Sequence, residues 1–498
     1  MQIFGAILVA ISAGVVSGQF NLHHWTGRSG VVNLFEWKWR DVAVECEQFL
    51  SVKGFGGVLV SPPTENALVL NPRRPWWERY QPISHYLNSR SGTEDEFMDM
   101  VSRCNIIGVR VYVDVVLNHM AGMTDYGGVG GSLGNVSLMY YPAVPYTASE
   151  FNPNCEVTSD SNPLEIRNCR LNGSPDLNLN SEWVRDRIVN LLNKFISYGV
   201  AGFRIDAAKY MWPADLQNLY SRLLNLSEFH GFPPGSRAFI SQLVDDTIEY
   251  ESISKYEYSP LGTVSEYLYS QKIGSFFSGQ QPLTLLQNWG PFWGFLPSER
   301  SVVFIDNHIN QRIPSSPRSH ILTHRESKSY ILANVFMLAH PYGLPQVMSS
   351  FEFNNIDQGP PSDASGNTVS PTISEEGFCG NGWICEHRWT PIANMVGFRN
   401  AVADTSISLW VDNGAYQVAF CRGNRGFVAF NLEDTDLDLT MQTCLSEGTY
   451  CDVISGSVLN GSCTGYSVQV DANGLARIYV AARGGYGALA IHVNSKVI

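Results

Sequence analysis

The stretch Gly202-Phe-Arg-Ile-Asp-Ala-Ala-Lys-Tyr210 decides how the fold of this chain is interpreted. An apolar run leads through Arg204 to Asp206, and this pattern predicts a buried strand that ends in a carboxylate. In an α/β protein, a carboxylate at the C-terminal end of a strand lies where such folds place their chemistry. A buried aspartate that only forms a salt bridge is the alternative, so the flanking sequence has to decide between the two.

Strand-like and helix-like segments alternate on both sides of this stretch. Strands are predicted at 31–35, 57–61, 109–116, 200–206, 238–241 and 301–305, and helices at 41–50, 94–104, 183–198 and 331–338. Repeated strand–helix units over about 400 residues favour an α/β fold of the (β/α)8 TIM-barrel type. A glycine- and asparagine-rich excursion, from about 118 to 180, interrupts the series after the third strand.

Beyond about residue 407 the pattern changes. Apolar or alternating runs at 408–415, 417–421, 426–432 and 477–481 lie between turn signals, as in an antiparallel β-sandwich. We therefore expect a separate C-terminal domain.

Composition restricts the class of partner. Of 498 residues, 44% are apolar and 16% are charged, as in a well-packed protein with one large domain and a smaller one. The formal net charge of −13 would repel nucleic acid and anionic membranes, so neither is expected as a partner. We expect a monomer.

Three features predict export from the cell. Residues 1–18 contain an uncharged apolar run, which predicts a cleaved signal peptide and a secreted, extracellular protein. Ten cysteines, an even number, predict five disulfides whose pairing the count leaves open. Four Asn-x-Ser sequons predict a glycoprotein, at Asn135, Asn172, Asn225 and Asn460.

Four stretches share a recognisable order and spacing: Asp114-Val-Val-Leu-Asn-His119, residues 202–210, Phe239-Ile-Ser-Gln-Leu-Val-Asp245 and Phe304-Ile-Asp-Asn-His-Ile309. They resemble the four motif regions of the α-amylases, glycoside hydrolase family 13, and most closely the animal-type enzymes. Further likeness at 35–39, 71–82, 339–343 and 451–456 extends this over nearly the whole mature chain. The resemblance implies a barrel (domain A, 19–117 and 187–406), a calcium-binding domain B at 118–186 and a C-terminal β-sandwich (domain C, 407–498).

The resemblance assigns three carboxylates to catalysis, and this chain keeps one of them. Asp206 matches the nucleophile. The family's general acid is a glutamate at the position of Leu243, and its third carboxylate, which stabilises the cation-like transition state, is an aspartate at the position of Ile309. Identical flanking residues anchor both alignments.

Leucine and isoleucine can neither transfer a proton nor carry charge. Retaining glycoside hydrolysis needs a nucleophile and a second carboxyl group, and losing a positioned general acid typically removes about 10²- to 10⁴-fold in rate. Asp246 matches a family aspartate with another role, and Glu249 or Glu251 would reach the site only through a rebuilt loop. We therefore predict an α-amylase-like pseudoenzyme.

The positions that hold sugar in the family are better preserved. They are Trp76, Trp77 and Tyr80, which match an aromatic stacking platform, and His119, Arg204, Lys209 and His308, which match polar contacts. Core aromatic residues, structural histidines and a solvated surface lysine are the alternative interpretations. The expected ligand is an α-glucan or a maltooligosaccharide.

Calcium in the family lies between the barrel and domain B. The resemblance implies side-chain oxygens of Asn118 and Asp176 and backbone carbonyls of Arg167 and Tyr210 as ligands, which are the hard donors that Ca²⁺ prefers.

Chloride is not expected, because Gln346 occupies the position of a chloride-binding arginine, although Arg204 and Asn307 match the other two ligands. The family's glycine-rich mobile loop corresponds here to 313–320, which has two prolines and no glycine, so substrate-coupled loop motion should be reduced.

Two other functions stay open at this stage. A working glycosidase with a rebuilt site would need a second carboxylate within about 5–5.5 Å of Asp206. A secreted interaction or storage protein would bind no maltooligosaccharide.

Overall fold

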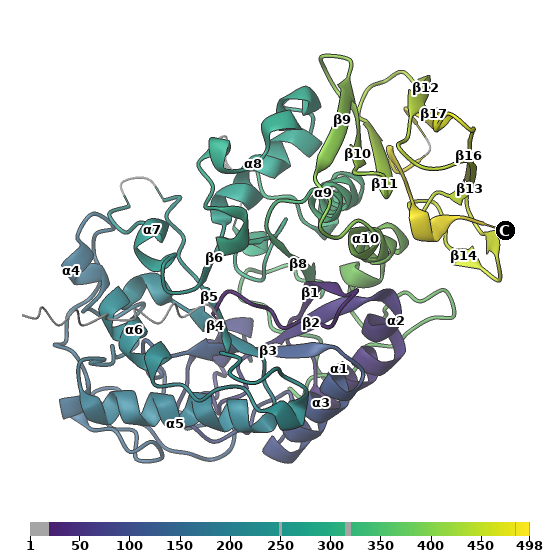
Figure 1. Cartoon of the computed structure of the whole chain (residues 1–498). Helices are drawn as coiled ribbons and strands as arrows, with labels where there is room; N and C mark the ends of the chain where they lie inside the picture. The colour runs from purple at the N-terminus through teal and green to yellow at the C-terminus, as the bar shows by residue number, and fades with distance from the viewer. Residues whose placement is uncertain (1–18, 249–250, 314–319, 484, 498) are drawn as a thin grey trace, which may run out of the picture.

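A computed structural model describes residues 19–248, 251–313, 320–483 and 485–497 (Figure 1). The predicted signal peptide and residues 314–319 of the proline-containing loop lie outside these ranges. Eight parallel strands close into a barrel in chain order, which confirms the predicted fold class. They are β1 (Ser29–Leu34), β2 (Phe55–Val60), β3 (Arg110–Val116), β4 (Gly202–Asp206), β5 (Phe239–Gln242), β6 (Thr263–Ser265), β7 (Ser301–Val303) and β8 (Leu344–Ser349).

The barrel strands are rich in apolar residues, and most of their residues are buried. Every residue of β2 and β4 is buried, as parallel strands require when helices cover the outer face. In register, Val116 pairs with Asp206, and Ile205 pairs with Gln242. Because all eight strands run in the same direction, the residues that follow them meet at one rim.

Helices alternate with these strands. They are α1 (Trp39–Glu45), α2 (Ser51–Lys53), α3 (Glu94–Ile106), α4 (Pro163–Ile166), α5 (Glu182–Tyr198), α6 (Pro213–Ser221), α7 (Lys255–Tyr258), α8 (Tyr267–Phe277), α9 (Ser327–Ala339) and α10 (Thr390–Ala401). A capping box at Thr93 starts α3, and Gly199, in the left-handed conformation, ends α5. The predicted helix 41–50 is instead α1 followed by a π-helical turn, η1 (Cys46–Leu50).

The excursion between β3 and α5 contains little regular structure. It holds α4, the disulfide Cys155–Cys169 and isolated bridges, of which His119 with Asp176 returns the end of the excursion to its beginning. The excursion therefore forms one wall above the rim of the barrel.

The C-terminal residues form antiparallel sheets, as predicted. A four-stranded sheet has the order β18-β11-β10-β9, from β9 (Ile407–Asp412), β10 (Gln417–Arg422), β11 (Gly426–Asn431) and β18 (Ala488–His492). Three pairs complete the domain: β12 (Leu437–Gln442) with β17 (Leu475–Val480), β13 (Gly448–Cys451) with β16 (Ser467–Val470), and β14 (Val458–Leu459) with β15 (Ser462–Cys463).

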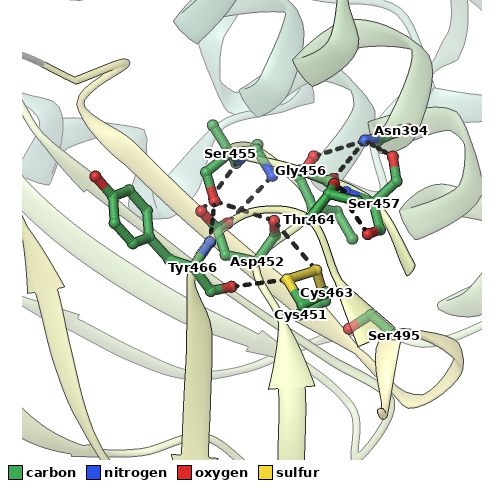
Figure 2. Close-up of a disulfide and its surroundings, with 12 residues drawn as sticks. Asn394, Cys451, Asp452, Ser455, Gly456, Ser457, Cys463, Thr464, Tyr466 and Ser495 are labelled. Carbon is green, nitrogen blue, oxygen red and sulfur yellow. Dashed lines mark hydrogen bonds between the residues drawn. A yellow bond between two sulfur atoms is a disulfide. The ribbon is translucent and has the colours of Figure 1, made fainter. Parts of the chain in front are cut away.

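The second domain packs on α9 and α10 of the barrel (Figure 1). Phe336 of α9 lies 6.0 Å from Phe430 of β11 between ring centroids. Figure 2 shows the contact near the Cys451–Cys463 disulfide, where the Asn394 amide of α10 donates to the carbonyls of Val453 and Gly456. Apolar packing and these polar contacts join the two domains through a continuous interface.

All ten cysteines are paired, which confirms the predicted five disulfides. The pairs are Cys46–Cys104, Cys155–Cys169, Cys379–Cys385, Cys421–Cys444 and Cys451–Cys463. In the part of the chain that the structure describes, no helix combines the length and apolar character that crossing a membrane requires.

Candidate active site

A cavity of about 410 Å³ opens at the C-terminal rim of the barrel. The aromatic turn η2 (Trp76–Tyr80) forms one side, and the excursion forms another. Its lining residues are Trp76, Trp77, Tyr80, Gln81, His119, Met123, Leu171, Asn172, Ser174, Asp206 and Ile309. Among these described residues, Asp206 is the only carboxylate.

Asp206 is held by an arginine that also binds a second carboxylate. Arg204 Nη1 donates to Asp206 Oδ1 at 3.2 Å and to both oxygens of Asp114 at 2.7 Å. Burial raises the pKa of Asp206, and the nearby Arg204 charge opposes that rise. Burial likewise raises the pKa of Asp114 to about 6. The arrangement fixes one carboxylate at the floor of the cavity.

Leu243 occupies the position directly after β5, and its backbone is fixed. Its N–H donates to the carbonyl of Ile205 at 3.0 Å, and its carbonyl accepts from the N–H of Lys209 at 3.3 Å. These bonds keep the backbone of residue 243 beside β4.

Ile309 follows β7 and lines the cavity directly. Its N–H donates to Asn307 Oδ1 at 2.9 Å, which closes the turn that carries it. An isoleucine therefore lines the same cavity as Asp206.

The nearby acids that could replace the lost group are occupied elsewhere. Asp245 accepts from Thr247, and Asp246 accepts from the Lys255 N–H at 3.2 Å. Glu251 binds Lys209 Nζ at 2.6 Å. None of these three lines the cavity, and Glu249 lies outside the described residues.

Lys209 is buried rather than solvated. Its side chain is 6% exposed and its ammonium is paired with Glu251. The interpretation of Lys209 as a surface lysine is therefore wrong, and the residue is not part of the cavity lining.

The two predicted sugar-binding histidines lie at different depths. His119 lines the cavity, whereas His308 is 1% exposed and stacks between Phe35 and Tyr80, with ring centroids 4.6 and 5.4 Å away. His308 Nε2 lies 2.8 Å from the Tyr80 hydroxyl. Burial lowers the pKa of His308 well below its usual value, so the ring is neutral.

Supports of the aromatic platform come from distant segments that sequence patterns did not indicate. Trp76 Nε1 donates to the Ile356 carbonyl at 2.8 Å, and Trp77 Nε1 donates to Asp357 Oδ1 at 2.9 Å. In each pair the two residues are 280 positions apart in the chain, so no local sequence pattern indicates the contact. Asn172 and Ser174 of the cavity wall were likewise noted only as a sequon.

Arg204 and Gln346 both line a small internal cavity of about 20 Å³ within the barrel, and Asn307 does not. Asn307 Nδ2 instead donates to the Tyr267 hydroxyl at 3.1 Å. The three positions that the resemblance assigns to chloride therefore do not line one cavity together.

The residues implied for calcium come together where the excursion meets the barrel. Asn118 Nδ2 lies 2.8 Å from Asp176 Oδ1 and 3.1 Å from the Tyr210 carbonyl. Asn118, Arg167 and Tyr210 line a second cavity, of about 380 Å³. Burial raises the pKa of Asp176 to about 7 because it disfavours the charged carboxylate. A bound cation would offset this penalty.

The protonation of His119 shows which way the Asn118 amide has to face. His119 Nε2 meets the Tyr80 carbonyl, which can only accept, so Nε2 carries the proton. Burial lowers the pKa of His119 to about 4, so Nδ1 is an acceptor and needs a donor from Asn118. If the Asn118 side-chain amide is rotated by 180°, its Nδ2 donates to His119 Nδ1, and its Oδ1 faces Asp176 and the Tyr210 carbonyl. Three converging oxygens fit a hard cation.

The chain combines a closed parallel barrel, a rim cavity with a buried carboxylate and an all-β C-terminal domain. Residues 78–253 match the family model described as "Alpha amylase, catalytic domain", and residues 410–494 match "Alpha amylase, C-terminal all-beta domain". The chain belongs to the α-amylase family.

The similarity to known relatives and to solved structures extends over nearly the whole length of this chain. The chain is 51% identical over 496 residues to the alpha-amylase of Tribolium castaneum, covering 99% of this chain and 100% of the relative. It is 50% identical over 495 residues to the alpha-amylase-related protein of Drosophila ercepeae, covering 99% and 98%. The crystal structure of wild-type alpha-amylase I from Eisenia fetida superposes with a TM-score of 0.89 at 40% identity, covering 94% and 98%. A variant of that enzyme has been solved with maltohexaose.

Proposed function

We propose that this chain is a secreted, α-amylase-like pseudoenzyme that binds α-1,4-glucans and does not hydrolyse them at a family-like rate. The observation that carries the proposal is that Leu243 and Ile309 stand at the positions that the resemblance assigns to two carboxylates. Ile309 lines the cavity together with Asp206, and the backbone of Leu243 is bonded to Ile205. In the part of the chain that the structure describes, no second carboxylate lines the cavity.

The chemical reason lies in the leaving group. When a carboxylate attacks the anomeric carbon, the departing sugar oxygen must receive a proton, which the general acid supplies. Leu243 has no proton to give, and Ile309 cannot stabilise the positive charge that develops on the sugar ring. The loss of the acid alone accounts for about 10²- to 10⁴-fold in rate.

Binding is supported separately from catalysis. The cavity has two tryptophans and a tyrosine on one side and polar groups at its floor, which is the mixture that sugar rings and hydroxyls require. The Eisenia enzyme variant binds maltohexaose, and its fold matches this chain closely. We infer a maltooligosaccharide as ligand for the present cavity.

Calcium and secretion complete the proposal. Asn118 Oδ1, Asp176 and the carbonyls of Arg167 and Tyr210 would hold Ca²⁺, and its role would be structural, because the site joins the excursion to the barrel. Five disulfides suit an oxidising compartment and support export.

Restoring both carboxylates tests the proposal. The purified chain should release no reducing sugar from soluble starch at high protein concentration, and Leu243→Glu with Ile309→Asp should restore release. Adding Asp206→Asn to that double variant should abolish it again, which controls for contaminating enzymes. Family-like turnover by the unmodified chain would disprove the pseudoenzyme. Absence of maltohexaose binding in calorimetry would instead favour a non-carbohydrate role.

A further inference from the structure

A tight turn in the excursion forms part of the cavity wall. The Ser174 N–H donates to the Leu171 carbonyl at 3.0 Å, and the two residues between them have φ of +50° (Asn172) and +76° (Gly173). Positive φ at both central positions is the type I′ turn, for which Asn-Gly is the preferred pair. Asn172 is therefore at the tip of the turn.

The turn is anchored while its tip remains exposed. Ser174 is 1% exposed and its Oγ accepts from Gln81 Nε2 at 3.3 Å. The backbone of Gly173 packs against Gly122, where an added Cβ would approach it to 3.0 Å. Asn172 is exposed, and its amide forms no hydrogen bond to another residue of the described ranges. A rigid base thus presents an unengaged amide at the cavity.

Asn172-Gly-Ser174 is also an acceptor sequence for N-linked glycans. We propose that Asn172 carries an N-linked glycan that covers the mouth of the glucan-binding cavity. The inference rests on the proposed secretion and deepens the proposed binding function, because the glycan would regulate access to that same site.

The modification is a group transfer with a lipid-diphosphate-linked oligosaccharide as donor. The Asn172 Nδ2 atom forms a bond to the anomeric carbon of the first sugar. The bond from that carbon to the diphosphate oxygen breaks, and the lipid diphosphate leaves with the bonding electrons. The amide nitrogen loses one proton, which the departing diphosphate takes up. Since Ser174 is buried in the folded chain, transfer has to precede folding of the excursion.

The position of Asn172 determines the consequence. It lines the same cavity as Trp77 and Asp206, so the first sugars of an attached chain lie beside the platform on which an external glucan would stack. A glycan is bulky and strongly hydrated. It therefore competes with free maltooligosaccharides for the cavity and shields Trp77 from solvent.

The other three sequons provide matched controls within the same chain. Asn135, Asn225 and Asn460 are exposed, but none of them lines the cavity. Asn460 also has φ of +50°, which makes Asn460→Gln a conformational match for Asn172→Gln.

The experiment compares secreted protein from insect cells with three variants. Asn172→Gln and Ser174→Ala each remove the sequon, the second while keeping the asparagine side chain, and Asn460→Gln is the control. Mass spectrometry of the peptide that contains residue 172 reports the glycan. Hydroxyl-radical oxidation of Trp77 and maltohexaose calorimetry report access to the cavity.

We expect a glycan on Asn172, and at least tenfold tighter maltohexaose binding with faster Trp77 oxidation in both sequon variants, but not in Asn460→Gln. An unmodified Asn172, or equal Trp77 oxidation in all forms, would overturn the inference. If Trp77 oxidation rises in the sequon variants while no form binds maltohexaose, the covering glycan stands and the proposed binding function fails.

Discussion

Arg204 holds two buried carboxylates, Asp114 and Asp206, with a single guanidinium. Arg204→Leu should lower the free energy of unfolding by about 3–5 kcal/mol, because it leaves both carboxylates without their cation. Urea unfolding followed by tryptophan fluorescence measures the change. Arg477→Leu is the control, since the Arg477–Asp438 pair is exposed to solvent and its loss should not move the midpoint. Equal midpoints for both variants would show that the buried cluster does not depend on Arg204.

Glu386 should make stability depend on pH. Burial raises its pKa from 4.5 to about 7, although the Ser350 N–H and hydroxyl both donate to it. The unfolded chain releases this proton near pH 4.5, whereas the folded chain keeps it until about pH 7. The folded state binds more protons in that window, so this group lowers the free energy of unfolding as pH rises.

Glu386→Gln should therefore flatten the fall in the free energy of unfolding between pH 4.5 and 7, a fall of at most about 1.4 kcal/mol per pH unit. Unfolding midpoints at several pH values measure it. Replacement of Glu447, which is exposed, should leave the pH profile unchanged. If the free energy of unfolding of Glu386→Gln falls with pH as steeply as that of the unmodified chain, other groups cause the pH dependence.

The short turn η2 presents the aromatic platform, and residues far along the chain hold it in place. Trp77→Ala should weaken maltohexaose binding at least tenfold, about 1.4 kcal/mol, because one stacking face is lost. Calorimetry on the Asn172→Gln background separates this effect from any glycan. Trp183→Ala on α5 is the control, since Trp183 is 44% exposed and does not line the cavity. Unchanged affinity after Trp77→Ala would remove the platform from the proposed binding mode.

Elements differ in how well local sequence predicts them. An apolar run from Val200 predicts the strand that ends at Asp206, and β4 has the predicted end but begins two residues later, at Gly202. Strands β6 and β8 were missed: β6 has three residues, and β8 contains Pro345. Both exist because neighbouring strands complete their hydrogen bonding in the closed barrel. The π-helical turn after α1 also has no local signal.

The proposed calcium ligands lie on three separate segments, so this site belongs to the scale of the whole molecule. Asn118 follows β3, Asp176 ends the excursion, and Tyr210 follows β4. Chelation should lower the melting temperature, and calcium at a hundredfold excess over its dissociation constant should restore about 2.7 kcal/mol.

Calorimetric melting with and without a chelator measures this. Asp176→Asn should melt at the same temperature in both conditions, whereas Asp363→Asn, at an exposed position, should respond as the unmodified chain does. If neither the chelator nor calcium changes the melting temperature of the unmodified chain, the proposed site is contradicted.

The sequence by itself determined the fold class and the order of the two domains. Periodicity, turn residues and motif spacing are local properties, and they are sufficient where one segment carries the information. They placed Asp206 at a strand end, and the resemblance of the motifs led to the prediction that Leu243 and Ile309 replace carboxylates.

Only the tertiary structure decided which of these residues share a cavity. It placed Asn172 in the wall of the cavity that Trp77 also lines, paired Lys209 with Glu251 and left His308 buried against Tyr80. These outcomes depend on contacts between segments that lie far apart in the chain, such as Trp77 and Asp357, which are 280 residues apart. Their energies are set by burial and by the geometry of the closed barrel, and neither leaves a pattern within any single stretch of sequence.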